Sequence, residues 1–155
     1  MGFDLYGLKP NNPNNAIKPT IDWTVKHTEK EKTEYFDALS KYEDQVVGDY
    51  FRNNVWFWRP LWMFVCKNCS DILSEKNMTM GTYNDGHEIS KTKAMRIGKR
   101  LKKLLHDGTA KKYELANNAE FDSDGNKIDT SYPFYTDNVE QFADFCLNSN
   151  GFTIH

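Results

Sequence analysis

The thirteen residues from Tyr50 to Trp62 hold six aromatic rings, two arginines and an asparagine pair, the densest chemical feature of this 155-residue chain. Aromatic rings offer flat faces for stacking, and a guanidinium offers paired hydrogen bonds to a phosphate or carboxylate. The segment therefore predicts a site for a small anionic, nucleotide-like ligand. The predicted ligand-binding residues are Tyr50, Arg52, Asn53, Asn54, Trp56, Trp58, Arg59 and Trp62.

The same segment also fits an aromatic core. The chain contains 10 Phe, 8 Tyr and 4 Trp, nearly as many rings as its Leu, Ile and Val residues together. Rings bury large apolar areas, and the polar tips of Tyr and Trp need partners when buried. In this interpretation Arg52 and Arg59 stack on rings or pair with acids such as Asp49. A solvent-open concavity around the arginines would favour the ligand, and pairing with acids would favour the core.

Charge is strongly segregated along a chain whose net charge is only −2. Residues 91–112 carry nine lysines and arginines against one aspartate, whereas residues 113–155 carry eight acids and one lysine. At helical spacing, four of the cations form one stripe, which predicts contact with a phosphate backbone. These residues are Lys93, Arg96, Arg100 and Lys103. The alternative is a solvated helix face that pairs with the acidic C-terminal third.

Asp85, His87 and Glu88 are the one place where a histidine and two carboxylates fall within four residues, and they are weak candidates for acid–base catalysis. The chain has no P-loop, nucleophile elbow, zinc-protease or dinucleotide motif, which favours a protein that is not an enzyme. Otherwise His87 is an ordinary residue between a turn and a helix cap.

No metal or cofactor is expected. Cys66 and Cys69 form a single C-x-x-C pair inside a predicted helix, and Asp122–Asn126 imitates only the opening of a calcium loop. Three cysteines, no long apolar run and no signal-like start predict a cytoplasmic protein without membrane spans.

The elements that position these residues are mostly helical. Thr28, with Glu31 three residues later, predicts a capped helix ending at Gly48, and Pro60 predicts the first turn of a helix running to about Ser74. Ser90 caps the next helix, which runs to His106 before Gly108. The remaining expected elements are a strand in residues 1–9, a loop over 10–20, a helix over Thr109–Asn117, two strands around the turn Phe121–Ile128, a helix from Thr136 or Asp137 to Gly151, and a strand over Phe152–Ile154.

We therefore expect one domain over residues 1–155, mainly α with a small β element (α+β). It is predicted to be a compact bundle of four to five helices, with short strands near the termini and at residues 119–132.

Four segments of the chain resemble a family of small bacteriophage accessory proteins of uncharacterised activity: Met1–Gly7, Tyr50–Trp62, Asn84–Gly86 and Asn148–Ile154. The likeness spans most of the chain. Many family members carry zinc-ribbon-like cysteine pairs before the last helix, but Asp122–Asp129 contains no cysteine, so that metal site does not transfer. The resemblance implies a phage protein in the cytoplasm of an infected bacterium and supplies no catalytic residues.

A phage accessory protein of this size is expected to act by binding. The leading hypothesis is that the protein binds a nucleotide-like ligand and so counters a host defence. The alternatives are a protein that binds nucleic acid, a protein that binds a host protein and, as the last choice, a small hydrolase. The sequence also leaves open whether a second copy of the chain completes the binding pocket.

Overall fold

The computed structural model describes residues 1–128 and 131–155, which form six helices and six short strands. The predicted α+β class is confirmed, with one short helix beyond the expected four to five. Among the described helices, none combines the length and apolar character that crossing a membrane requires. In chain order the elements are β1 (Gly2–Gly7), α1 (Glu29–Gln45), β2 (Tyr50–Asn54), α2 (Val55–Asn68), α3 (Glu75–Met80), β3 (His87–Ile89), α4 (Lys91–His106), α5 (Thr109–Asn117), β4 (Glu120–Phe121), β5 (Lys127–Ile128), α6 (Thr136–Ser149) and β6 (Phe152–Ile154).

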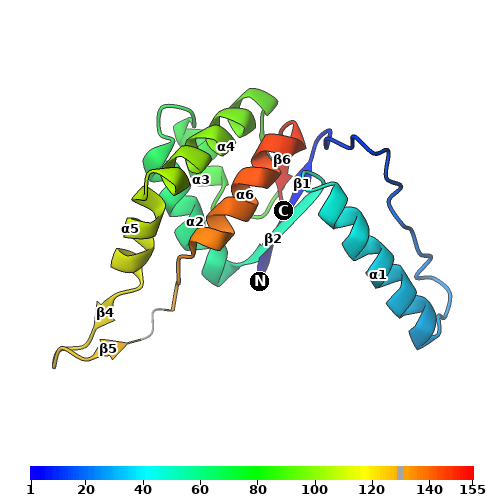
Figure 1. Cartoon of the computed structure of the whole chain (residues 1–155), viewed down its shortest axis with the longest axis horizontal. Helices are drawn as coiled ribbons and strands as arrows, with labels where there is room; N and C mark the ends of the chain where they lie inside the picture. The colour runs from blue at the N-terminus through cyan, green and yellow to red at the C-terminus, as the bar shows by residue number, and fades with distance from the viewer. Residues whose placement is uncertain (129–130) are drawn as a thin grey trace.

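Four of the strands form one antiparallel sheet in the order β2-β1-β6-β3 (Figure 1). Successive strand residues point to opposite faces. In the register, Leu5 of β1 lies between Phe51 and Ile154, and these three side chains are buried. On the other face Asp4 lies opposite Arg52. The sheet therefore has one apolar face toward the helices and one polar face that the helices leave open.

Rings fill much of the space between the sheet and the helices. Trp58 and Trp62 of α2 stack with centroids 5.3 Å apart, and Trp58 also contacts Phe3 of β1 and Phe142 of α6. The helices α4 and α6 pack closely because residue 98 is glycine: a Cβ there would lie 2.7 Å from Cγ of Leu147. The aromatic excess of the chain is therefore mainly core material.

Most of the local signals are confirmed. Thr28 and Glu31 form the capping box of α1, and Ser90 caps α4 through the backbone N–H of Lys93. The last helix begins at Thr136, and the chain turns after it through left-handed Asn150 (φ 55°) and Gly151 (φ 95°). Residues 10–20 form neither helix nor strand, as predicted. The two short strands around residues 121–128 are β4 and β5.

The predicted helix from Pro60 to Ser74 is wrong at both ends. The helix α2 begins at Val55, because the Asn54 side chain accepts from the Phe57 backbone N–H at 3.1 Å, and Pro60 is tolerated inside it. It ends at Asn68. Three elements were not predicted: β2, α3 and β3. The strands are short, and the dense rings of β2 hid its alternation of inward and outward residues.

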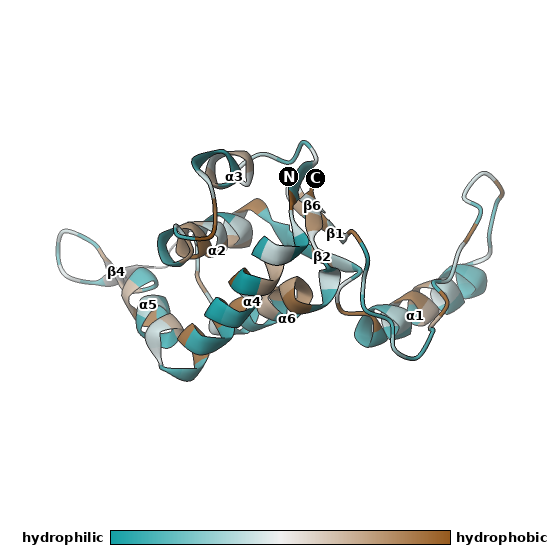
Figure 2. Cartoon of the chain, turned by 90° about the horizontal axis from the view of Figure 1, so that it is seen from above, coloured by the Kyte–Doolittle hydropathy of each residue, from teal (hydrophilic) through white to brown (hydrophobic). Residues whose placement is uncertain are grey.

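The N-terminal region contains an arm, defined here as residues 8–45, that projects from the body of the molecule (Figures 1 and 2). Its helix α1 buries no residue. At the base, Nζ of Lys18 lies 2.7 Å from Oδ2 of Asp49 and over the ring of Tyr42. The helix stops at Gln45, before the predicted Gly48, because Val46 turns into the core.

Candidate functional site

The structure divides the eight predicted ligand-binding residues among three environments, because the aromatic segment changes from strand β2 to helix α2 at Asn54. Strand residues alternate between two faces of the sheet, whereas in a helix only residues three or four positions apart lie on the same face. The segment is therefore not one continuous site. Each of its parts has a different set of neighbours.

Tyr50 and Arg52 lie on the open face of the sheet and share one carboxylate. The Tyr50 hydroxyl donates a short hydrogen bond to Asp4, and Nε of Arg52 is 3.5 Å from Oδ1 of Asp4. Partial burial and the Asp4 carboxylate together raise the pKa of Tyr50. An acid does pair with Arg52, but it is Asp4 from the neighbouring strand and not Asp49, which binds Lys18.

Asn53 and Asn54 stabilise the fold locally. The amides of Asn53 and Asn138 exchange two hydrogen bonds, at 2.8 and 3.0 Å, which tie β2 to the start of α6. The Asn54 side chain caps α2. Both side chains therefore already have partners within the chain.

Trp58 and Trp62 are buried, at 0% and 2% exposure. Their indole N–H groups donate to the carbonyls of Gly81 and Met78, at 2.8 and 3.0 Å. A Cβ on Gly81 would lie 2.1 Å from Cε2 of Trp62, so the chain after α3 approaches these rings as only glycine allows. The two tryptophans hold α3 and the following turn against α2.

Arg59 and Trp56 remain, and both are exposed on the outer side of α2. Arg59 lies between two neighbouring hollows and borders both of them. The first has a volume of about 380 Å³ and is lined by Trp58, Arg59, Trp62, Met63, Thr82 and Tyr83. The second has a volume of about 310 Å³ and is lined by Arg59, Pro60, Met63, Tyr113, Asn117 and Tyr132. We call this pair the Arg59 site.

Among the acids whose side chains the structure describes, which excludes Glu120 and Asp129, none forms an ion pair with the guanidinium of Arg59. Its recorded contact is with the hydroxyl of Tyr132, at 3.5 Å. The ring of Trp56 lies 5.1 Å from that of Tyr132, and Met63 and Tyr83 are 66% and 57% exposed. The site thus combines an exposed cation, unpaired among the described side chains, with exposed rings and a thioether, which suits an anion that carries a planar apolar group.

The four residues of the predicted basic stripe lie on α4, but three of them already have partners within the chain. Arg100 makes a two-pronged contact with Asp71, at 2.9 Å on each side, and Arg96 lies 3.8 Å from the same carboxylate. These contacts lower the pKa of Asp71 to about 2. Lys93 donates to the side chain of Asn77. Of the four, only Lys103 lacks such a partner among the described side chains, and nucleic-acid binding by the stripe stays a prediction.

The structure does not bring Asp85, His87 and Glu88 together. His87 and Glu88 are neighbours on β3, so their side chains point to opposite faces of the sheet. Nε2 of His87 lies 3.0 Å from the amide nitrogen of Asn77, and Asp85 is exposed in the preceding turn. This arrangement offers no acid–base pair around the imidazole.

The three cysteines are free thiols. Burial raises the pKa of Cys66 and of Cys69 to about 11, so both are protonated at neutral pH. Asp122 accepts from the backbone N–H groups of Asp124 and Asn126, which closes a tight turn. No cluster of three or more potential metal ligands occurs in residues 1–128 and 131–155.

Sequence reasoning missed most of the lining of the Arg59 site. Tyr83 was visible only as part of a turn, and Tyr113 only as part of a short helix. Nothing in the periodicity of α2 shows that Tyr83 and Tyr132, which are far from it along the chain, border the same arginine. The usable signal is Arg59 itself with Met63, an exposed pair one turn apart on a helix whose other residues before Lys67 are apolar.

Comparisons with models of known protein families, with curated proteins and with solved structures found no match to this chain.

Proposed function

We propose that the protein acts by binding a small anionic, nucleotide-like ligand at the Arg59 site. One observation carries this proposal: an exposed guanidinium, unpaired among the described side chains, lies between two ring-lined hollows. Guanidinium groups bind phosphate through paired, charge-assisted hydrogen bonds. Binding therefore supplies an ion pair that Arg59 does not make with any described side chain, whereas Arg52 and Arg100 already pair with Asp4 and Asp71.

The phosphate of the ligand would lie at Arg59 and its planar base in the larger hollow. That hollow is walled by the exposed faces of Met63 and Tyr83, and its floor is formed by the edges of Trp58 and Trp62. Its volume of about 380 Å³ falls in the range of sites for small ligands. Because hydrogen bonds and packing hold the tryptophans in place, the floor exists before the ligand arrives.

The second hollow gives the site its polar edges. Asn117 and Tyr132 border it, and Asn117 is held by a hydrogen bond from its amide to the Tyr132 carbonyl at 3.2 Å. A ribose or a second phosphate placed here would still contact Arg59, because that side chain borders both hollows. A ligand with groups on both sides of one phosphate therefore fits better than a free base.

The resemblance to bacteriophage accessory proteins supports a biological setting for such binding. A phage protein that sequesters a nucleotide signal in the cytoplasm of an infected bacterium acts without chemistry. This role agrees with the separated positions of Asp85, His87 and Glu88.

A thermal-shift screen with nucleoside monophosphates, triphosphates, cyclic nucleotides and inorganic phosphate tests the proposal. We expect at least one nucleotide to raise the melting temperature more than phosphate does. Tyr83→Ala, which removes a wall of the larger hollow, should abolish most of that shift. Tyr6→Ala is the matched control, because Tyr6 is a comparably exposed ring (45%) on the open sheet face. If no nucleotide shifts the wild type, or if both variants lose the shift equally, the proposal is wrong.

A further inference from the structure

The arm exposes apolar side chains that the body of the protein does not cover. Figures 1 and 2 show it extending away from α4 and α6 in two perpendicular views. Trp23, Val25 and Phe36 are each more than half exposed, and Ile17 is 90% exposed. Exposed apolar groups gathered on one projecting element are typical of a surface that contacts another molecule.

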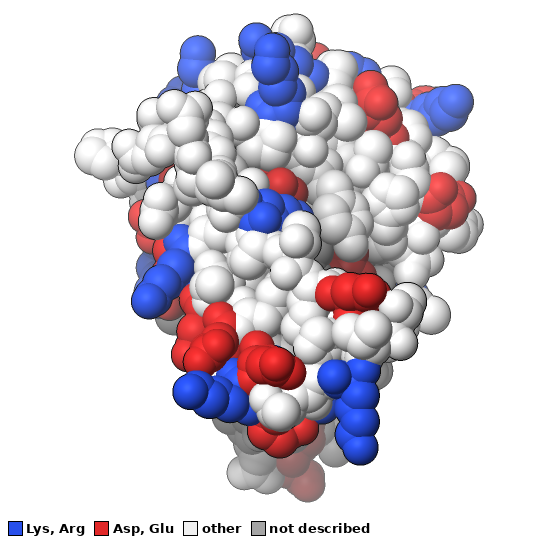
Figure 3. Space-filling view, turned by 90° about the vertical axis from the view of Figure 1, so that its right-hand side faces the viewer, with Lys and Arg blue, Asp and Glu red and all other residues white. Residues whose placement is uncertain are grey.

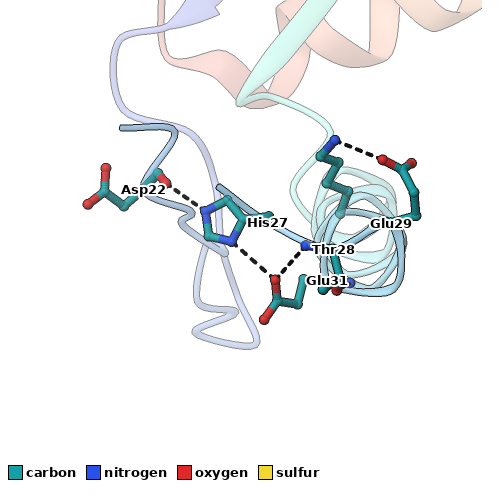
Figure 4. A network of polar contacts seen from close by, with 6 residues as sticks. Asp22, His27, Thr28, Glu29 and Glu31 are labelled. Carbon is teal, nitrogen blue, oxygen red and sulfur yellow. Dashed lines mark hydrogen bonds and ion pairs between the residues drawn. The ribbon is translucent and has the colours of Figure 1, made fainter. Parts of the chain in front are cut away.

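Hydrogen bonds and an ion pair nevertheless fix the tip of the arm (Figure 4). Nε2 of His27 lies 2.6 Å from the Asp22 carbonyl oxygen and Nδ1 lies 3.5 Å from Glu31, while Thr28 and Glu31 close the capping box. The ring of Trp23 contacts those of Tyr35 and Phe36, at 5.8 and 6.0 Å. These contacts hold the apolar rings in a fixed arrangement at the surface.

Within the arm, the acidic excess lies in the helix α1. The helix α1 carries six acids and three lysines. Two lysines pair with acids of the same helix, Lys30 with Glu34 and Lys32 with Glu29. Figure 3, which views the molecule from this end, shows red and blue side chains between broad uncharged areas. Asp37 and Asp44 lie two turns apart and form no ion pair with another described residue.

The body carries a surface of opposite charge on α4. This helix has seven lysines and arginines and no acid. Beside it is a hollow of about 250 Å³, lined by Ile72, Arg96, Lys99, Arg100 and Lys103. Lys99 and Lys103 are exposed, one turn apart, and without an ion pair to any described acid. An aromatic side chain can fill a hollow of this size, and acids beside it would meet the two lysines.

We propose that the arm of one copy of this chain docks on α4 of a second copy. Phe36 enters the hollow next to Ile72, and Asp37 and Asp44 pair with Lys99 and Lys103. The charge complementarity points to a second copy, because the acidic helix α1 extends away from the basic helix α4 of its own chain, so the two can meet only between molecules. Reciprocal docking of two arms around a two-fold axis gives a closed dimer.

Sedimentation velocity and charge reversal test this inference. We expect the wild type to sediment as a dimer at low salt and to dissociate as salt screens the ion pairs. Asp37→Lys with Asp44→Lys, and separately Lys99→Glu with Lys103→Glu, should each raise the dimer dissociation constant about 100-fold. The four changes together should restore the dimer, because the charges are then complementary again.

Lys76→Glu with Lys112→Glu is the matched control, since it makes the same change in charge at two exposed lysines away from α4. It should leave the dimer intact. Each altered side chain is exposed, so circular dichroism should show an unchanged fold. A monomeric wild type at low salt overturns the inference, as does a dimer that survives both reversals. A monomer that binds duplex DNA and loses it with Lys99→Glu and Lys103→Glu also overturns it, in favour of nucleic acid.

Discussion

Arg52 and Arg59 belong to one short aromatic segment, yet their surroundings are opposite. Arg52 projects from β2 onto the open sheet face, where the register places it across from Asp4. Arg59 projects from the outer side of α2 between two hollows and meets no described acid. Residue type alone therefore does not identify a binding arginine. The neighbouring element decides whether an acid lies within reach of the charge.

The same contrast holds between the inner and outer sides of α2. Inward, Trp58 and Trp62 are buried and hydrogen-bonded, while outward, Arg59 and Met63 are exposed one turn apart. Variants on the two sides should separate stability from binding, and this gives the following predictions.

Trp58→Ala should have the largest effect on the free energy of unfolding. The ring is fully buried against Phe3, Trp62 and Phe142, and its N–H holds the Gly81 carbonyl. Loss of a buried tryptophan costs about 3–5 kcal/mol. Urea unfolding followed by far-UV circular dichroism measures it. A loss below about 1 kcal/mol would contradict the assignment of this side of α2 to the core.

Asn54→Ala should cost about 1 kcal/mol, because it removes the side-chain cap of α2. Asn54→Asp serves as its control, since a carboxylate can accept from the same N–H. Restored stability in the aspartate variant identifies the cap as the cause. An alanine variant as stable as the wild type in urea would show that the helix start is set by packing alone.

Arg59→Ala should change the free energy of unfolding by less than about 0.5 kcal/mol, because the side chain is exposed and makes one long contact. Arg52→Ala is also expected to be mild, about 0–1 kcal/mol, since its pair with Asp4 is largely exposed. Thermal unfolding of both variants checks this. A large decrease in the free energy of unfolding of Arg59→Ala would show that Arg59 stabilises the fold.

The smallest expected effect is a change in the pKa of Asp71 when its partner Arg100 is replaced. Arg100 holds the pKa of Asp71 at about 2, below its ordinary 3.8. The folded value is depressed, so this pair contributes to stability above about pH 4, and the contribution is lost as the pH falls toward 2. Arg100→Gln should move the Asp71 pKa back toward 3.8 in an NMR titration of the side-chain carboxyl. An unmoved value would show that Arg100 does not set it.

Local signals in the sequence predicted the starts of α1 and α4 and the turn after α6, because capping depends on residues close along the chain, whereas α2 was misplaced at both ends and α3 was missed. Thr28, Ser90 and Gly151 each mark an end that the structure confirms. The strands β2 and β3 were missed, since they have only five and three residues and β2 continues directly into α2. The Arg59 site was predicted only in part. Its walls come from Tyr83, Tyr113 and Tyr132, whose approach to α2 depends on tertiary packing and leaves no periodic signal.

The most direct measurement compares Arg59→Ala with Arg52→Ala in calorimetric titrations with the nucleotide that gives the largest thermal shift. The account predicts that Arg59→Ala raises the dissociation constant about 10–100-fold, the loss expected for charge-assisted hydrogen bonds, while Arg52→Ala leaves it within about twofold. Equal losses in the two variants, or unchanged affinity in Arg59→Ala, would contradict the claim that Arg59 is the residue that anchors the ligand.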